Sequence, residues 1–198
     1  MPPNEFQRAF LGSVRQLTKN TGVALEQMFD LSAQRLVRLA ITITGTQPDA
    51  EDALQAAFSR IAARPKLLAR ADLPWPYLIR IVRNEALRIV QKKRHSRLGD
   101  FDRSGNEPTA DDVYQQEETA EHVRRILKTL PAAQYEVVIL KHWEDLTFVE
   151  IAEALGKSQN TVASRYRYAM EKLQRSLEPI VRDSVSASPN TCSPPSTI

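Results

Sequence analysis

The chain has 198 residues, a length that suggests one large domain or two small ones. Hydrophobic residues make up 42% and charged residues 26%, a balance typical of a folded, soluble protein. The single cysteine, Cys192, excludes a disulfide framework and a zinc cluster built on cysteine. Six glycines are few for a β-sandwich, a barrel or a glycine-looped α/β fold. Because no apolar stretch is long enough to span a membrane and no signal peptide is visible, we expect a cytoplasmic protein without membrane insertion.

The net charge of +3 is distributed very unevenly along the chain. Basic residues dominate 80–97, acidic residues dominate 99–121, and basic residues dominate again over 157–175. Alternating blocks of this kind indicate two cationic surfaces joined by an anionic connector. The alternative interpretation is that each run is only the solvated face of a helix.

Composition divides the chain into five predicted segments. At the N-terminus, apolar residues at roughly helical spacing favour a short docking helix as one interpretation. The linker contains glycine, proline and many acids without apolar periodicity, so we predict that it is flexible. The tail is rich in serine and proline and cannot bury a core, so we predict that it is disordered. The segments are an N-terminal extension (1–22), a helical domain (23–97), the linker (98–118), a second helical domain (119–178) and the tail (179–198).

The first folded segment has the apolar periodicity of a small helical bundle. One helix ends at Gly45, and the next starts with Thr46 and Asp49, whose spacing predicts a capping box. Pro65 ends this second helix, and we predict a loop over 65–74. A third helix follows over 75–94. The sequence therefore predicts an all-α protein of two small helical domains joined by an acidic flexible linker.

The third helix of this segment carries a row of polar and basic side chains. Arg80, Asn84, Arg88 and Lys92 recur at every fourth residue and so share one surface line. Guanidinium groups neutralise phosphates and amides can read base edges, which favours a nucleic acid as the ligand. Trp75 at the helix entrance is suited to stacking on an unpaired base, or alternatively to ordinary core packing.

The second folded segment contains the signature of a helix-turn-helix. Thr147 and Glu150 predict a capping box, Gly156 predicts a left-handed helix end, and Ser158 is a candidate cap for the next helix. Short polar and basic residues then occupy the exposed side of the second helix near its start, where major-groove readers place their contacts. A plain helical hairpin is the alternative. The candidate DNA-reading residues are Ser158, Gln159, Asn160, Thr161, Ala163, Ser164, Arg165 and Arg167.

Three stretches of this sequence together resemble a known family. They are DAEDALQAAF at 49–58, PWPYLIRIVRNEALRIVQKKR at 74–94, and the segment 130–173 that contains the helix-turn-helix. In order and spacing they are similar to bacterial RNA polymerase sigma factors of the sigma-70 family, in the extracytoplasmic-function (ECF) group that keeps only regions 2 and 4. One departure is Ala163, which stands where family members usually carry a lysine.

The resemblance implies a function and a set of partners. It implies a factor that binds core RNA polymerase through the clamp of the largest subunit and the flap of the second largest, recognises the −10 and −35 promoter elements, opens the DNA and directs transcription initiation. Family members often also bind an anti-sigma factor. The implied polymerase contacts are Asp49, Glu51, Asp52 and Gln55, and the implied −10 contacts are Arg80, Arg83, Asn84, Arg88, Lys92, Lys93 and Trp75.

Two other classes of function fit the sequence less well. A stand-alone helix-turn-helix regulator would need only one DNA-reading surface, whereas the basic helix at 80–97 offers a second. A helical enzyme would need a catalytic constellation, but the three histidines are scattered and no nucleophile or phosphate-loop motif occurs. The sequence therefore predicts no catalysis, no cofactor and no metal site.

Overall fold

The computed structural model describes residues 3–99, 125–127 and 129–186 of the chain. These residues contain helices and connecting turns but no strand, which confirms the predicted all-α class. Residues 100–118 of the predicted linker, the first six residues of the predicted second domain (119–124) and the tail from 187 lie outside the described residues, whereas Leu98 and Gly99 belong to the last helix of the first domain. The helices are α1 (Pro3–Gln16), α2 (Thr21–Thr44), α3 (Gln47–Ala63), α4 (Pro65–Ala69), α5 (Pro74–Gly99), α7 (Ala132–His142), α8 (Phe148–Leu155) and α9 (Gln159–Ser186).

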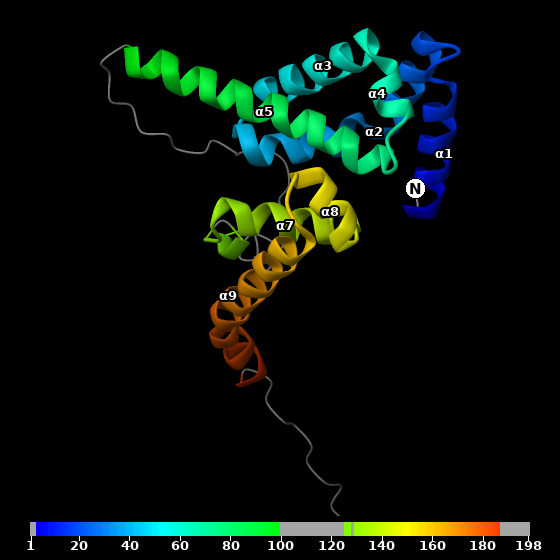
Figure 1. Cartoon of the computed structure of the whole chain (residues 1–198). Helices are drawn as coiled ribbons and strands as arrows, with labels where there is room; N and C mark the ends of the chain where they lie inside the picture. Colours follow the sequence, from blue (N-terminus) through cyan, green and yellow to red (C-terminus); the bar gives the residue numbers. More distant parts are fainter. Residues whose placement is uncertain (1–2, 100–124, 128, 187–198) are drawn as a thin grey trace, which may run out of the picture.

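The first module, residues 3–99, is a bundle in which α2, α3 and α5 pack around a shared apolar core (Figure 1). The N-terminal helix α1 docks onto this bundle, which was one interpretation of the spacing of its apolar residues. Phe6, Phe10 and Val14 of α1 and Leu17 just after it are all buried. The rings of Phe6 and Phe10 meet the ring of Trp75 edge to face, with centroid distances of 4.8 and 5.2 Å. The N-terminal extension is therefore part of the first module.

Two local predictions for the first module were wrong. Thr46 is the N-cap of α3 but makes no side-chain cap hydrogen bond. The carboxylate of Asp49 accepts a hydrogen bond of 2.6 Å from Lys93 Nζ on α5, a partner that the sequence did not indicate. The predicted loop at 65–74 contains the short helix α4, whose Leu68 is fully buried in the core.

The second module comprises α7, α8 and α9, and its turn chemistry matches the prediction. Thr147 Oγ1 accepts from the Glu150 backbone N–H, and the Glu150 side chain accepts from the Thr147 backbone N–H, which confirms the capping box. Gly156 ends α8 with φ +60°, a conformation that glycine adopts without a steric cost. Ser158 Oγ accepts from the Thr161 N–H and caps α9. Helix α9 continues to Ser186 and so extends into the segment for which disorder was predicted.

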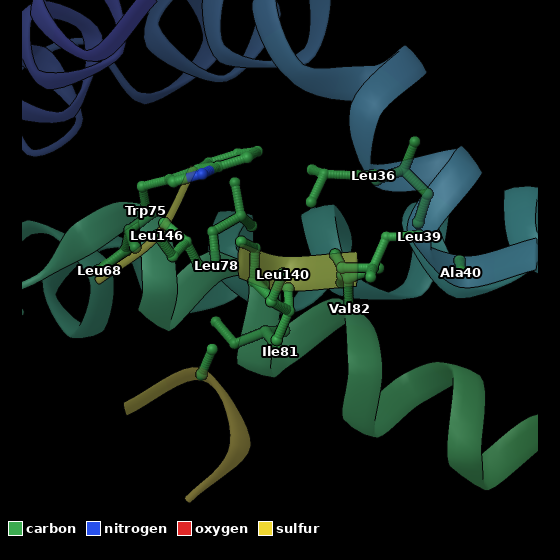
Figure 2. Packing of buried hydrophobic residues seen from close by; sticks show 14 of the residues in the cluster. Leu36, Leu39, Ala40, Leu68, Trp75, Leu78, Ile81, Val82, Leu140 and Leu146 are labelled. Carbon is green, nitrogen blue, oxygen red and sulfur yellow. The ribbon is translucent and has the colours of Figure 1, made fainter. Parts of the chain in front are cut away.

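The two modules pack against each other and share one hydrophobic cluster. Figure 2 shows Leu140 and Leu146 of the second module in the same cluster as Leu78 and Ile81 of α5. Leu146 and Leu78 are completely buried. The main contact between the modules is that of α5 with α8. This interface places the first helix of the helix-turn-helix beside the basic helix of the first module.

Candidate nucleic-acid interface

Helix α5 presents the predicted row of polar and basic residues along one side. Asn84, Arg88 and Lys92 are exposed, and Arg80 at the start of the row is half-buried. The Arg80 guanidinium lies 3.3 Å from the carboxylate of Glu153 on α8. The end of the row near Lys92 therefore faces solvent, whereas the end near Arg80 contacts the second module.

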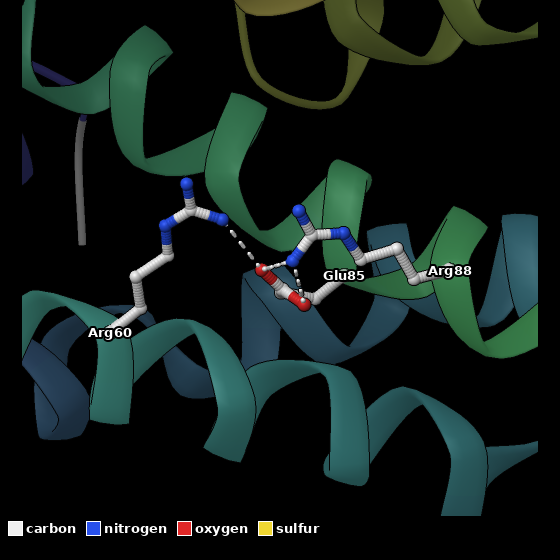
Figure 3. A network of polar contacts seen from close by, with 3 residues as sticks. All are labelled: Arg60, Glu85 and Arg88. Carbon is white, nitrogen blue, oxygen red and sulfur yellow. Dashed lines mark hydrogen bonds and ion pairs between the residues drawn. The ribbon is translucent and has the colours of Figure 1, made fainter.

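Arg88 is held in place by an acid that also binds a second arginine. Glu85 is the only acid in the basic run of α5, and its side chain is mostly buried. It accepts hydrogen bonds from Arg88, at 3.0 Å, and from Arg60 of α3, at 3.1 Å (Figure 3). The carboxylate thus joins α3 to α5 and aligns two guanidinium groups beside each other. Arg88 keeps a side-chain exposure of 63% and remains accessible to a phosphate.

Arg83 lies on the other flank of α5, where its guanidinium is paired with a glutamate of the second module. Its Nε and Nη2 each donate a 3.0 Å hydrogen bond to Glu136 of α7, a two-point pairing that matches the planar fork of arginine. The side chains of Arg83 and Glu136 are only 20% and 14% exposed. Among the sequence-predicted contacts for the −10 element, Arg83 is thus the most strongly engaged arginine.

Trp75, which was expected to contact DNA, is a core residue in this structure. It is only 5% exposed and lies between Phe6, Phe10 and Arg35, whose guanidinium stands over the Phe6 ring. Its indole Nε1 is buried without a hydrogen-bond partner. The apolar stripe of α5 and the aromatic side of α1 together bury the ring, so the core-packing interpretation is the correct one here.

The four residues implied for polymerase binding do not share one environment. Glu51, Asp52 and Gln55 are exposed on α3. Asp49 is buried and bonded to Lys93, so it holds the first turn of α3 against α5 and is not presented at the surface. Lys93 was expected among the DNA contacts, and in this structure its ammonium is committed to Asp49.

The exposed side of α9 carries the predicted DNA-reading residues of the helix-turn-helix. Ser158, Gln159, Asn160, Ser164 and Arg167 are exposed, and none of them lies in the interface with α5 that the ion pairs define. Thr161, Ala163 and Arg165 are partly buried at the edges of this face. Arg167 is 3.9 Å from Glu171 one turn later, a loose exposed pair that a phosphate can replace.

Glu144 is a structural residue that the sequence did not reveal. It lies in the turn between α7 and α8, is only 7% exposed, and receives a hydrogen bond of 3.0 Å from Arg35 Nε of α2. Burial raises the pKa of this carboxyl group, and the adjacent Arg35 and Arg38 partly offset that effect. Its partner is more than a hundred positions away in sequence, so no local pattern indicated the pair.

The described residues form helices only, with a helix-turn-helix in one module and a row of basic and polar side chains on the other. This combination is typical of a DNA-binding protein. Residues 28–96 match the family model of Sigma-70 region 2, and residues 126–175 match that of Sigma-70 region 4. The chain belongs to the sigma-70 family of RNA polymerase sigma factors, in its ECF group. Members of this family are regulatory proteins that bind core RNA polymerase and direct transcription initiation at promoters.

Individual relatives cover both modules. An RNA polymerase sigma-E factor of Streptomyces avermitilis is 32% identical over 148 residues, which make up 72% of this chain and 79% of that protein. The ECF sigma factor SigM of Mycobacterium tuberculosis is 34% identical over 164 residues, covering 78% of this chain and 77% of that one. A solved structure, the sigma factor RpoE of Bartonella quintana with the anti-sigma factor NepR, matches with TM-score 0.64 and 25% identity over 77% of this chain and 96% of that one.

None of the helices in residues 3–99 and 129–186 combines the length and the apolar character that crossing a bilayer requires.

Proposed function

We propose that this sigma factor opens promoters with the polar row of α5 and selects them with the exposed face of α9. In this assignment Arg88, Asn84 and Lys92, together with Arg80 and Arg83, hold the single strand of the −10 element. The residues from Ser158 to Arg167 read the −35 element in the major groove. The observation that supports the proposal is the presence of two separate surfaces with exposed basic and polar side chains, one in each family region, within a single chain.

The chemistry of the two surfaces suits two different tasks. On α5, the guanidinium and ammonium groups along one side can neutralise successive phosphates of a strand, and opening a duplex needs such contacts to offset the cost of unstacking. On α9, short polar side chains near the helix start can approach base edges closely, which duplex reading requires. The protein performs no catalysis in this scheme, because the polymerase supplies the chemistry.

The proposed polymerase contact is the exposed acidic side of α3. Glu51, Asp52 and Gln55 point to solvent there, whereas Asp49 supports the helix from inside. The clamp of the largest polymerase subunit is the proposed partner of this side, and the flap of the second largest subunit is the proposed partner of the second module. The Bartonella relative is bound to an anti-sigma factor, which by likeness supports such a partner for this chain also.

Transcription with core polymerase on a library of promoter sequences tests the proposal. The full-length chain should direct initiation at a subset of promoters that share two elements, and core polymerase without it should not. Tight, sequence-specific binding of the free protein to duplex DNA, without any transcript in the presence of core polymerase, would instead identify a stand-alone regulator.

A further inference from the structure

Two exposed guanidinium groups from different helices converge on one carboxylate. Arg60, the only basic residue of α3, and Arg88 of α5 both donate to Oε1 of Glu85, at 3.1 and 3.0 Å (Figure 3). Because both donors approach the same oxygen atom, the two guanidinium groups lie close together. Their side chains are 47% and 63% exposed, so the pair is open to solvent.

The charges of this cluster do not balance. Arg88 alone donates to both oxygens of Glu85 and is therefore sufficient to pair this carboxylate. Arg60 adds a second positive charge, which leaves the cluster with a surplus cation. Like charges at this range repel each other, and an exposed ion pair offsets little of that cost. Paired arginines with a surplus charge are typical of a site that binds phosphate.

Both guanidinium groups keep donors for such an anion. Arg60 and Arg88 each use Nη1 for Glu85, and within the part of the chain that the structure describes no other group pairs with their Nε or Nη2. A phosphodiester has two non-bridging oxygens, each of which can accept from a guanidinium fork. One phosphate can therefore contact both arginines while Glu85 stays paired.

The position of the cluster favours a nucleic-acid strand as the source of the phosphate. Arg88 belongs to the polar row of α5, with the exposed Asn84 one turn before it and the exposed Lys92 one turn after it. Arg60 lies beside this row and widens it toward α3. A carboxylate of the polymerase is the alternative ligand. The proposed polymerase contacts of α3, however, are two acids and an amide, which suit a basic partner surface.

We propose that Arg60 and Arg88 together bind one phosphate of the −10 strand, so that α3 contributes a strand contact of its own. This inference rests on the proposed function, because it extends the strand-binding row of α5 by one residue from another helix. It gives α3 two tasks, since the helix that presents the polymerase contacts also holds the strand.

The first test measures strand binding by the holoenzyme, in which the full-length protein is saturated with core polymerase. The probe is a fluorescent single-stranded oligonucleotide carrying the −10 sequence obtained from the promoter library. Oligothymidine is the second probe, because a phosphate contact does not depend on the base. Arg60→Ala should weaken binding roughly fivefold at low salt and lower the slope of log affinity against log salt by about 0.7, the value for one phosphate of a single strand.

Two further variants complete this measurement. Arg60→Lys should retain most of the affinity, because it keeps the positive charge. Arg15→Ala removes an exposed arginine from α1 and should leave both the affinity and the salt slope unchanged. Equal affinities of the wild type and Arg60→Ala for both probes overturn the proposed site.

The second test identifies the phosphate. A methylphosphonate linkage, which replaces a charged backbone oxygen by a methyl group, is placed at one position of the oligonucleotide at a time. One linkage should weaken binding by the wild type most, and this effect should be smaller in Arg88→Ala and absent in Arg60→Ala/Arg88→Ala. If adding Arg60→Ala to Arg88→Ala changes nothing, Arg60 only holds Arg88 in place, and the proposal is overturned.

Polymerase affinity distinguishes the strand from the alternative ligand. Arg60→Ala should bind core polymerase as tightly as the wild type in fluorescence anisotropy, a result that also shows that the variant is folded. Weaker polymerase binding together with unchanged strand binding at saturating polymerase would assign Arg60 to the polymerase and overturn the proposal.

The same variants separate failure of this site from failure of the proposed function. If Arg88→Ala weakens strand binding and Arg60→Ala does not, only the contact from α3 is wrong. If neither variant weakens it, both the strand-binding row of α5 and this site are wrong. If Arg60→Ala weakens binding of oligothymidine but the wild-type chain initiates at no promoter, the phosphate site is supported and the assignment as an initiation factor is wrong.

Discussion

At the scale of single residues, basic side chains on the same helix have different environments. Arg83 and Lys93 are paired with Glu136 and Asp49, whereas Arg88 shares Glu85 with Arg60 and keeps an exposed guanidinium. An exposed guanidinium whose orientation is already set loses less conformational entropy when it binds a phosphate. Arg88 is therefore the residue of α5 that the structure prepares best for a DNA contact.

Replacing this arginine should weaken promoter opening without affecting polymerase binding. We expect Arg88→Ala to lower opening at the cognate promoter roughly tenfold, since it removes a hydrogen-bonded charge contact. It should also reduce the salt slope of −10 oligonucleotide binding by about one ion. Permanganate reactivity of the promoter measures opening, and fluorescence anisotropy measures core polymerase binding. Arg15→Ala, an exposed arginine at the end of α1, is the control; unchanged opening by Arg88→Ala would refute the role.

At the scale of elements, two helix N-termini that carry the same capping-box signal differ in structure. Thr147 forms a reciprocal capping box with Glu150 at the start of α8, whereas Thr46 at the start of α3 makes no side-chain cap bond. In the first turn of α3 the carboxylate of Asp49 accepts a hydrogen bond from Lys93 of α5. The capping signal therefore marks the start of both helices, but the threonine side chain closes a cap only at α8.

The two threonines make a matched pair for a stability measurement. Thr147→Ala should lower the free energy of unfolding by about 1 kcal/mol, since it leaves backbone donors of α8 without their cap. Thr46→Ala should change it by less than half of that amount, and Thr147→Ser should preserve it. Urea unfolding followed by circular dichroism measures all three. Equal losses at positions 46 and 147 would show that the box of α8 contributes nothing.

At the scale of the whole molecule, the two family regions form one core and three ion pairs in the described residues. Apolar side chains on α5 that pack against Leu140 and Leu146 would be exposed if the modules separated. The buried pair of Arg35 and Glu144 adds to this coupling, because a buried carboxylate without its partner is costly. The free protein should consequently unfold as one cooperative unit.

Two probes on one molecule can test this cooperativity. In the variant Trp143→Phe the buried Trp75 is the sole tryptophan and reports on the first module. A fluorophore on Gln174→Cys, in a Cys192→Ser background, reports on the second module. We expect the two unfolding midpoints in urea to coincide, which is the behaviour of a two-state transition. Midpoints that differ beyond experimental error would show that the modules unfold independently.

The sequence by itself determined the helical class, the helix-turn-helix with its cap and glycine turn, and the polar row of α5, and it left a docking helix at the N-terminus as one interpretation. These features depend on periodicity and local turn chemistry, which neighbouring residues specify among themselves. Only the tertiary structure decided that Trp75 and Asp49 are buried and that the short helix α4 forms where a loop was predicted. It also decided that glutamates of the second module form ion pairs with arginines of the first. Those outcomes join residues such as Arg35 and Glu144 that are 109 positions apart, and no local pattern specifies which distant partner a charged side chain will meet.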